Sequence, residues 1–98
     1  MRTIQINGNT YKIAYNLRSQ FTYEEIAGQP YDGKKLVDNY MLLYAMLLAN
    51  NEGFSLEFSE LVDACDEDPT IFRTFCGEIE DYAKKMSAFI TDKKKVSR

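Results

Sequence analysis

The sequence contains no histidine and no tryptophan, and it has only two cysteines in 98 residues. Without histidine, the chain lacks the side chain that most often serves as a general base and as a metal ligand. Cys65 and Cys76 form neither a disulfide framework nor the close pair of a zinc site. The five glycines match no phosphate-binding or dinucleotide-binding pattern. These absences argue against an enzyme, and we expect no cofactor, no metal and no small-molecule substrate.

Long apolar segments are missing as well. The longest, residues 40–49, has ten residues, whereas a membrane-spanning helix needs about 20. The first residues show neither the apolar core nor the small-residue cleavage site of a signal peptide. We therefore expect a cytoplasmic protein that does not bind a membrane and keeps its two thiols reduced.

Charge is distributed unevenly along a chain whose net charge is −3. Residues 1–37 carry five basic and three acidic side chains, residues 38–81 carry eleven acidic and one basic, and residues 82–98 carry six basic and one acidic. The acidic middle repels phosphates, so we expect no nucleic-acid partner. We place one domain at residues 1–92 and a basic tail at residues 93–98. This tail is either a solvated terminus or an arm that docks on an acidic surface, such as that of a neighbouring copy.

The N-terminal region predicts a β-hairpin over residues 4–15. Apolar residues alternate with polar ones on both sides of Asn7-Gly8-Asn9, which is a strong turn signal. A type I′ turn centred on Asn7-Gly8 and a type II′ turn centred on Gly8-Asn9 both place the same apolar residues on one face. A lone hairpin is unstable, so helices must cover that face.

A short helix is expected next, over residues 16–27. Asn16 or Ser19 could cap its start, and Gly28 stands where a left-handed residue commonly ends a helix. Glu24 and Glu25 are expected to face water. The residues expected to face inward are Leu17, Phe21 and Ile26.

Two further helices are expected at residues 34–50 and 55–66, and Ser55 is the candidate N-cap of the second. From residue 40 onward the first of these is apolar on all sides. Such a helix either lies at the centre of the fold or commits a second face to a partner. Its candidate partner-binding residues are Tyr40, Leu43, Tyr44 and Leu47.

The last helix is expected to start at Asp68-Pro69, because aspartate caps a helix and proline fits its first position. Its apolar residues recur every three or four positions, as in a coiled coil. A length of about 22 residues, or ~33 Å, exceeds what a compact domain of this size needs, which allows the end to project and meet another chain. Its candidate partner-binding residues are Phe72, Phe75, Ile79, Tyr82, Met86 and Phe89.

Together these elements predict an α+β fold, in which an N-terminal β-hairpin packs on four α-helices. The fold is mainly helical and has a long C-terminal helix. The two apolar stripes have more area than one small hairpin can cover, so we weigh partner binding equally with burial in the core.

The N-terminal third resembles the small tail assembly chaperones of long-tailed phages and prophages. The matching segments are IQINGNTYKI at residues 4–13 and FTYEEIAGQ at residues 21–29. This sequence differs by having Ala27 where threonine is common and Gln29 where lysine is common. The matched positions are structural in character, so no functional residue is carried over; these positions are Asn7, Gly8, Glu24, Glu25 and Gly28.

The resemblance implies an α+β protein of the bacterial host cytoplasm that has no catalytic activity and self-associates. It also implies transient binding to the hydrophobic, helical tape measure protein during tail assembly. A partner helix would then lie against the two apolar stripes. The alternative is a small structural or regulatory subunit, such as a virion component or an antitoxin-like module, with a fixed protein partner.

Overall fold

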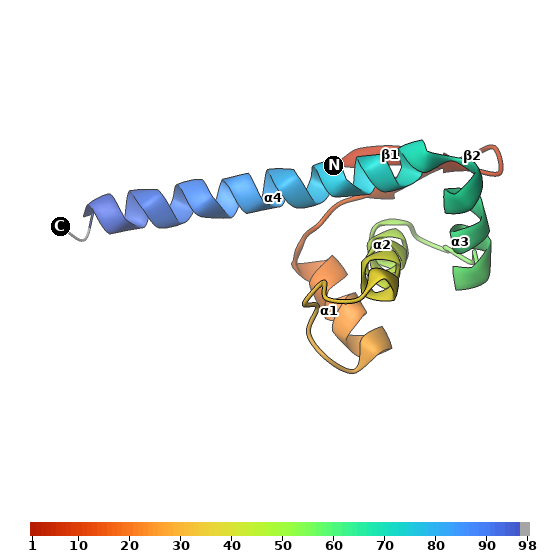
Figure 1. Ribbon diagram of the computed structural model, residues 1–98, viewed down its shortest axis with the longest axis horizontal. Helices are drawn as coiled ribbons and strands as arrows, with labels where there is room; N and C mark the ends of the chain where they lie inside the picture. Colours follow the sequence, from red (N-terminus) through yellow and green to blue (C-terminus); the bar gives the residue numbers. More distant parts are fainter. Residues whose placement is uncertain (97–98) are drawn as a thin grey trace.

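The structure, a computed structural model, describes residues 1–96, with side chains described as far as Phe89. The elements follow in the order β1 Arg2–Ile6, β2 Asn9–Ile13, α1 Leu17–Ala27, α2 Leu36–Asn50, α3 Phe58–Glu67 and α4 Pro69–Val96. The fold is α+β and mainly helical, as predicted. The hairpin and the first three helices gather around the first half of α4, whose second half extends away from them (Figure 1). The molecule is therefore elongated, and it measures 52 × 27 × 26 Å.

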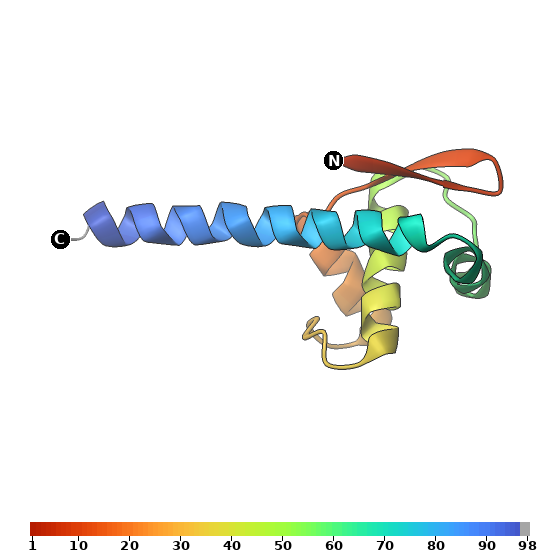
Figure 2. The same cartoon turned by 45° about the horizontal axis from the view of Figure 1, so that its top comes forward.

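The hairpin has the first of the two predicted registers. β1 and β2 are antiparallel, with Ile4 opposite Tyr11. Asn7 and Gly8 form the turn and both have positive φ, at 52° and 81°, which is the geometry of a type I′ turn. One face of the hairpin is covered because β1 contacts α4 and β2 contacts α2 (Figure 2). The isoleucines buried on that face are Ile4, Ile6 and Ile13.

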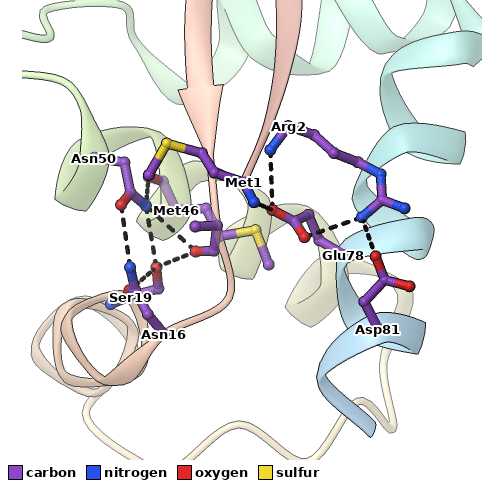
Figure 3. A network of polar contacts seen from close by, with 9 residues as sticks. Met1, Arg2, Asn16, Ser19, Met46, Asn50, Glu78 and Asp81 are labelled. Carbon is purple, nitrogen blue, oxygen red and sulfur yellow. Dashed lines mark hydrogen bonds and ion pairs between the residues drawn. The ribbon is translucent and has the colours of Figure 1, made fainter. Parts of the chain in front are cut away.

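A buried polar cluster determines how α1 begins. The Asn16 side chain caps the helix by accepting a hydrogen bond from the Ser19 amide at 2.9 Å. The Ser19 hydroxyl donates to the Ala14 carbonyl at 2.5 Å, and the Asn50 side-chain amide donates to the Ser19 hydroxyl at 3.3 Å (Figure 3). Ser19 is therefore a fully buried polar residue that joins α1 to the ends of β2 and α2. Gly28 ends the helix in the left-handed conformation, as predicted.

The prediction of which face of α1 points inward was wrong. The residues expected inside are exposed, with relative exposures of 63% for Leu17, 60% for Phe21 and 42% for Ile26. The buried residues of α1 are instead Ser19 and Tyr23, which lie four positions apart and so share one face. Anchoring Ser19 in the polar cluster turns this face toward the core, and Leu17 and Phe21 consequently point outward.

Helix α2 lies at the centre of the fold. It contacts α1, β2 and α3, which explains why its sequence is apolar on all sides. It begins at Leu36, two residues later than predicted, and only its first turn carries strongly exposed apolar side chains. Its fully buried apolar residues are Leu42, Leu43, Ala45, Met46 and Leu47.

Helix α3 begins at Phe58, three residues later than predicted, and Ser55 does not cap it. The chain before α3 stays extended because its apolar side chains pack on the core. The Phe54 ring contacts the Tyr11 ring at 5.3 Å and the Tyr44 ring at 5.8 Å. The Tyr44 hydroxyl donates to the Leu56 carbonyl at 2.7 Å.

Helix α4 starts as predicted and is longer than expected. The Asp68 carboxylate accepts hydrogen bonds from the Thr70 amide at 3.0 Å and from the Thr70 hydroxyl at 2.6 Å. The helix has 28 residues and is therefore about 42 Å long. It continues through Val96, beyond residue 92, and the last two residues of the predicted basic tail lie outside the described residues.

Ion pairs between β1 and α4 hold the near half of α4 against the hairpin (Figure 3). The Arg2 guanidinium lies 3.0 Å from the Glu78 carboxylate and 2.8 Å from the Asp81 carboxylate. The terminal amine of Met1 lies 3.6 Å from Glu78, which is itself buried. Beyond Tyr82, every described side chain of α4 is exposed. The helix therefore leaves the body of the molecule within about one turn of these ion pairs.

Candidate protein-interaction surface

The ten predicted partner-binding residues differ widely in exposure. Those buried in the core of the chain are Leu43, Leu47 and Phe75, and no partner can reach them in this conformation. Those that are half-buried are Tyr40, Tyr44, Phe72, Ile79 and Tyr82. The remaining two, Met86 and Phe89, are exposed on the far part of α4. The predicted stripe on α2 is thus mainly core, whereas the stripe on α4 changes from core to surface along its length.

Several of the half-buried aromatics join helices to one another. Tyr40 stacks on Phe72 with ring centroids 4.7 Å apart, and Phe72 lies 5.2 Å from Phe75. Tyr44 makes an edge contact with Phe58 at 5.6 Å. These contacts connect α2 with α3 and α4, so these aromatic residues serve packing within the folded chain.

An apolar groove runs between α1 and the middle of α4, and we name it the α1/α4 groove. Its volume is about 950 Å³. Its apolar lining combines residues from the start and the end of the chain, namely Tyr15, Leu17, Phe21, Tyr82 and Met86. Leu17 and Phe21, which were predicted to face inward, thus form one wall, and the predicted partner-binding residues Tyr82 and Met86 form the other.

The base of the α1/α4 groove is made of two tyrosine rings. Tyr15 and Tyr82 meet edge to face with ring centroids 4.6 Å apart, and the Gln20 side-chain amide donates to the Tyr82 hydroxyl at 3.4 Å. Burial raises the pKa of the Tyr15 hydroxyl, and the neighbouring Tyr82 raises it further. The two rings offer an aromatic surface that suits an apolar ligand.

The charged side chains that line the α1/α4 groove are both basic. Arg18 comes from α1 and Lys85 from α4. A groove with an apolar base and a positive rim matches a helix that has an apolar face flanked by acidic residues. Phe89 lies one turn beyond the groove on the same side of α4 as Met86 and extends the apolar surface outward.

A second apolar groove lies between α2 and α3, and we name it the α2/α3 groove. Its volume is about 440 Å³. It is lined by Leu36, Val37, Tyr40, Phe58, Val62 and Asp66. Leu36 is 71% exposed. Helix α3, which forms one side of this groove, lies at the end of the molecule opposite to the projecting part of α4 (Figure 1).

Sequence reasoning missed the contribution of α1 because that helix carries apolar residues on two faces. Leu17 and Phe21 share one face, and Ser19 and Tyr23 share another. Hydrophobicity alone favours the face with leucine and phenylalanine. The sequence signal that could have identified the inward face is Asn16 followed three residues later by Ser19. In the folded chain this capping pair is hydrogen-bonded to Asn50.

The chain matches no protein-family model, no curated protein and no solved structure. Among the side chains that the structure describes, which end at Phe89, no group of three or more acidic or cysteine residues could hold a metal ion. No helix in the described part of the chain is both long enough and apolar enough to cross a membrane. What the described residues do assemble is a pair of apolar grooves that differ in charge.

Proposed function

We propose that the protein is a non-enzymatic assembly factor that binds and shields an apolar helix of another protein. This function resembles that of a phage tail assembly chaperone holding a tape measure protein. The observation that carries the proposal is the α1/α4 groove, in which Leu17 and Phe21 stay exposed although each is as apolar as the core of the chain. Large apolar side chains gathered in a groove are a common mark of a protein-binding site.

The partner in this proposal is an amphipathic helix with acidic flanks. Its apolar face would lie along Leu17, Phe21 and Met86 and displace water from the two tyrosine rings. Its acidic flanks would meet Arg18 and Lys85 at the rim. The strongly acidic residues 38–81 would keep the complex soluble by repulsion between loaded copies.

A binding titration tests this proposal. The probe is a fluorescein-labelled amphipathic peptide with leucines on one face and glutamates on its flanks, and the readout is fluorescence anisotropy. We expect the double variant Leu17→Ser with Phe21→Ser to bind at least about 30-fold more weakly, as for two residues at the centre of an interface. The matched control is Ile26→Ser, because Ile26 is also an exposed apolar residue of α1 but does not line the groove. Equal loss in both variants, or no binding by the unmodified protein, would contradict the proposal.

Coexpression with a helical fragment of the tape measure protein of the same genome tests the identity of the partner. We expect the fragment to stay soluble with the unmodified protein and to precipitate with the Leu17→Ser, Phe21→Ser variant. A fragment that stays soluble with either protein, or with neither, would contradict a chaperone role. A permanent complex that survives dilution would instead indicate a fixed structural or regulatory subunit.

A further inference from the structure

We infer that copies of this chain associate head to tail, with the basic end of α4 of one copy seated in the α2/α3 groove of the next. This inference goes beyond the proposed function, and it uses a different surface from the one proposed for the helical partner. Helix α3, which forms one side of that groove, and the far end of α4 lie at opposite ends of the long axis of the molecule (Figure 1).

The α2/α3 groove supplies an apolar seat with an acidic side. Leu36, Val37 and Val62 provide apolar surface, and Asp66 lines the groove from α3. Residues 57–68 carry six acidic side chains and no basic one. Lys34 and Lys35 precede α2 but do not line the groove, whose charged lining residue is Asp66 of α3.

The far end of α4 has the complementary character. Phe89 is 60% exposed, and every other described side chain of α4 beyond Tyr82 is exposed as well. Residues 82–98 carry six basic side chains and one acidic. A short helical segment that packs on nothing is only marginally stable in water, because most helical stability comes from packing of an apolar face. Docking of the end of α4 on another surface would therefore bury Phe89 and stabilise the helix.

The occupant of the α2/α3 groove has to come from another molecule. Within one chain, α4 is a continuous helix that runs away from α3 (Figures 1 and 2), so its end cannot fold back to the groove. The α1/α4 groove is a poorer seat for the end of α4, because Arg18 and Lys85 at its rim would repel a basic helix. Charge therefore selects the α2/α3 groove of a second copy.

The two surfaces in this contact are different, so the contact is not a two-fold symmetric one. After two copies have joined, one of them still has a free groove and the other still has a free helix end. Such contacts either close into a ring or continue as a filament. We therefore expect oligomers larger than a dimer, which dissociate as the salt concentration rises because charges contribute to the contact.

A complementation experiment tests the head-to-tail arrangement. The helix-end variant is Phe89→Glu, and the groove variant combines Leu36→Lys with Asp66→Lys. All three residues are on the surface, so neither variant disturbs the core. We expect each variant alone to be monomeric in sedimentation velocity. We expect an equal mixture to form a one-to-one dimer, since one intact helix end then meets one intact groove.

Matched controls separate the specific contact from a general effect of charge. Ala88→Glu places the same acidic side chain on a different side of α4, and Glu60→Lys reverses a charge on the side of α3 away from the groove. We expect Phe89→Glu to weaken association at least about 30-fold and each control to change it less than about threefold.

Three results would overturn the inference. The first is an unmodified protein that stays monomeric up to about 1 mM, the weak limit of specific association. The second is a mixture that stays monomeric although the unmodified protein associates, because this would indicate a symmetric contact. The third is unchanged association of the groove variant. Peptide binding at the α1/α4 groove is measured separately, so failure of the head-to-tail inference and failure of the proposed function can be distinguished.

Discussion

Replacing Phe21 and Tyr23 by alanine, one at a time, tests the orientation of α1. The two residues are two positions apart on one helix, yet Phe21 is 60% exposed and Tyr23 is 1% exposed. An amphipathic interpretation of the sequence places Phe21 in the core. The structure instead predicts that Phe21→Ala costs little free energy of unfolding and that Tyr23→Ala costs much.

The expected magnitudes follow from the burial of each ring. A phenylalanine can bury about 200 Å², so the covered part of Phe21 is about 80 Å², equivalent to at most ~2 kcal/mol at ~25 cal/mol/Å². Alanine recovers about 0.5 kcal/mol through its higher helix propensity. Phe21→Ala should thus cost at most about 1.5 kcal/mol. Tyr23 packs edge to face on Tyr31 at 5.5 Å, and removing a fully buried aromatic ring costs about 3–5 kcal/mol.

The assay is urea unfolding followed by circular dichroism, at a protein concentration low enough to keep every variant monomeric. A common slope against urea shows that the differences arise from stability. We expect Tyr23→Ala to be less stable than Phe21→Ala by at least about 1.5 kcal/mol. Equal stability of the two variants, or the reverse order, would refute the orientation of α1 and with it the α1/α4 groove.

Three further predictions concern single groups. Burial raises the pKa of the half-buried Cys65 thiol to about 11, so about one molecule in a thousand carries its thiolate at pH 8; Ellman's reagent should modify the exposed Cys76 first, and equal rates would contradict this. Ser19→Ala should lower the free energy of unfolding in urea by about 1–3 kcal/mol, because its buried polar partners each lose a hydrogen bond; an unchanged midpoint would show that the cluster is dispensable. Hydrogen bonds from the Thr70 hydroxyl and amide lower the pKa of Asp68 from its ordinary 3.8, so the stabilising effect of Asp68 is present above pH 3.8 and is lost as the pH falls through the lowered pKa. Asp68→Ala should therefore lower the melting temperature at neutral pH and not in strong acid. A difference that persists in strong acid would contradict this capping role.

Local turn and capping chemistry made parts of the fold predictable. Asn7-Gly8 favours a type I′ turn because both residues tolerate positive φ, and the structure has that turn. Asp68 followed by Pro69 indicates the start of a helix, and α4 begins there. Such signals depend on neighbouring residues alone, and so they can be recognised in the sequence.

Features that depend on distant contacts were not predictable in the same way. The inward face of α1 is determined by hydrogen bonds of Ser19 with Ala14, which follows β2, and with Asn50 of α2, and periodicity does not reveal these bonds. The start of α3 is delayed because Leu56 packs on the core and its carbonyl accepts a hydrogen bond from the Tyr44 hydroxyl. In both places tertiary contacts outweigh local preference.

The candidate site was predictable in part for the same reason. Periodicity identified the stripe on α4 that ends at Met86 and Phe89, and both residues are exposed. It could not tell that Leu43 and Leu47 are enclosed, because burial of a helix that is apolar on all sides depends on what surrounds it. The opposite wall of the α1/α4 groove, Leu17 and Phe21, was assigned to the core.

The most direct measurement of the central claim is site-specific photo-cross-linking in the α1/α4 groove. A benzoylphenylalanine residue replaces Phe21 in one sample and the exposed Gln5 of the hairpin in the other, and each is irradiated with the labelled amphipathic peptide. We predict a peptide adduct at position 21 and none at position 5. Equal adducts at both positions, or no adduct at position 21 while the peptide is bound, would contradict the claim that this groove holds a helical partner.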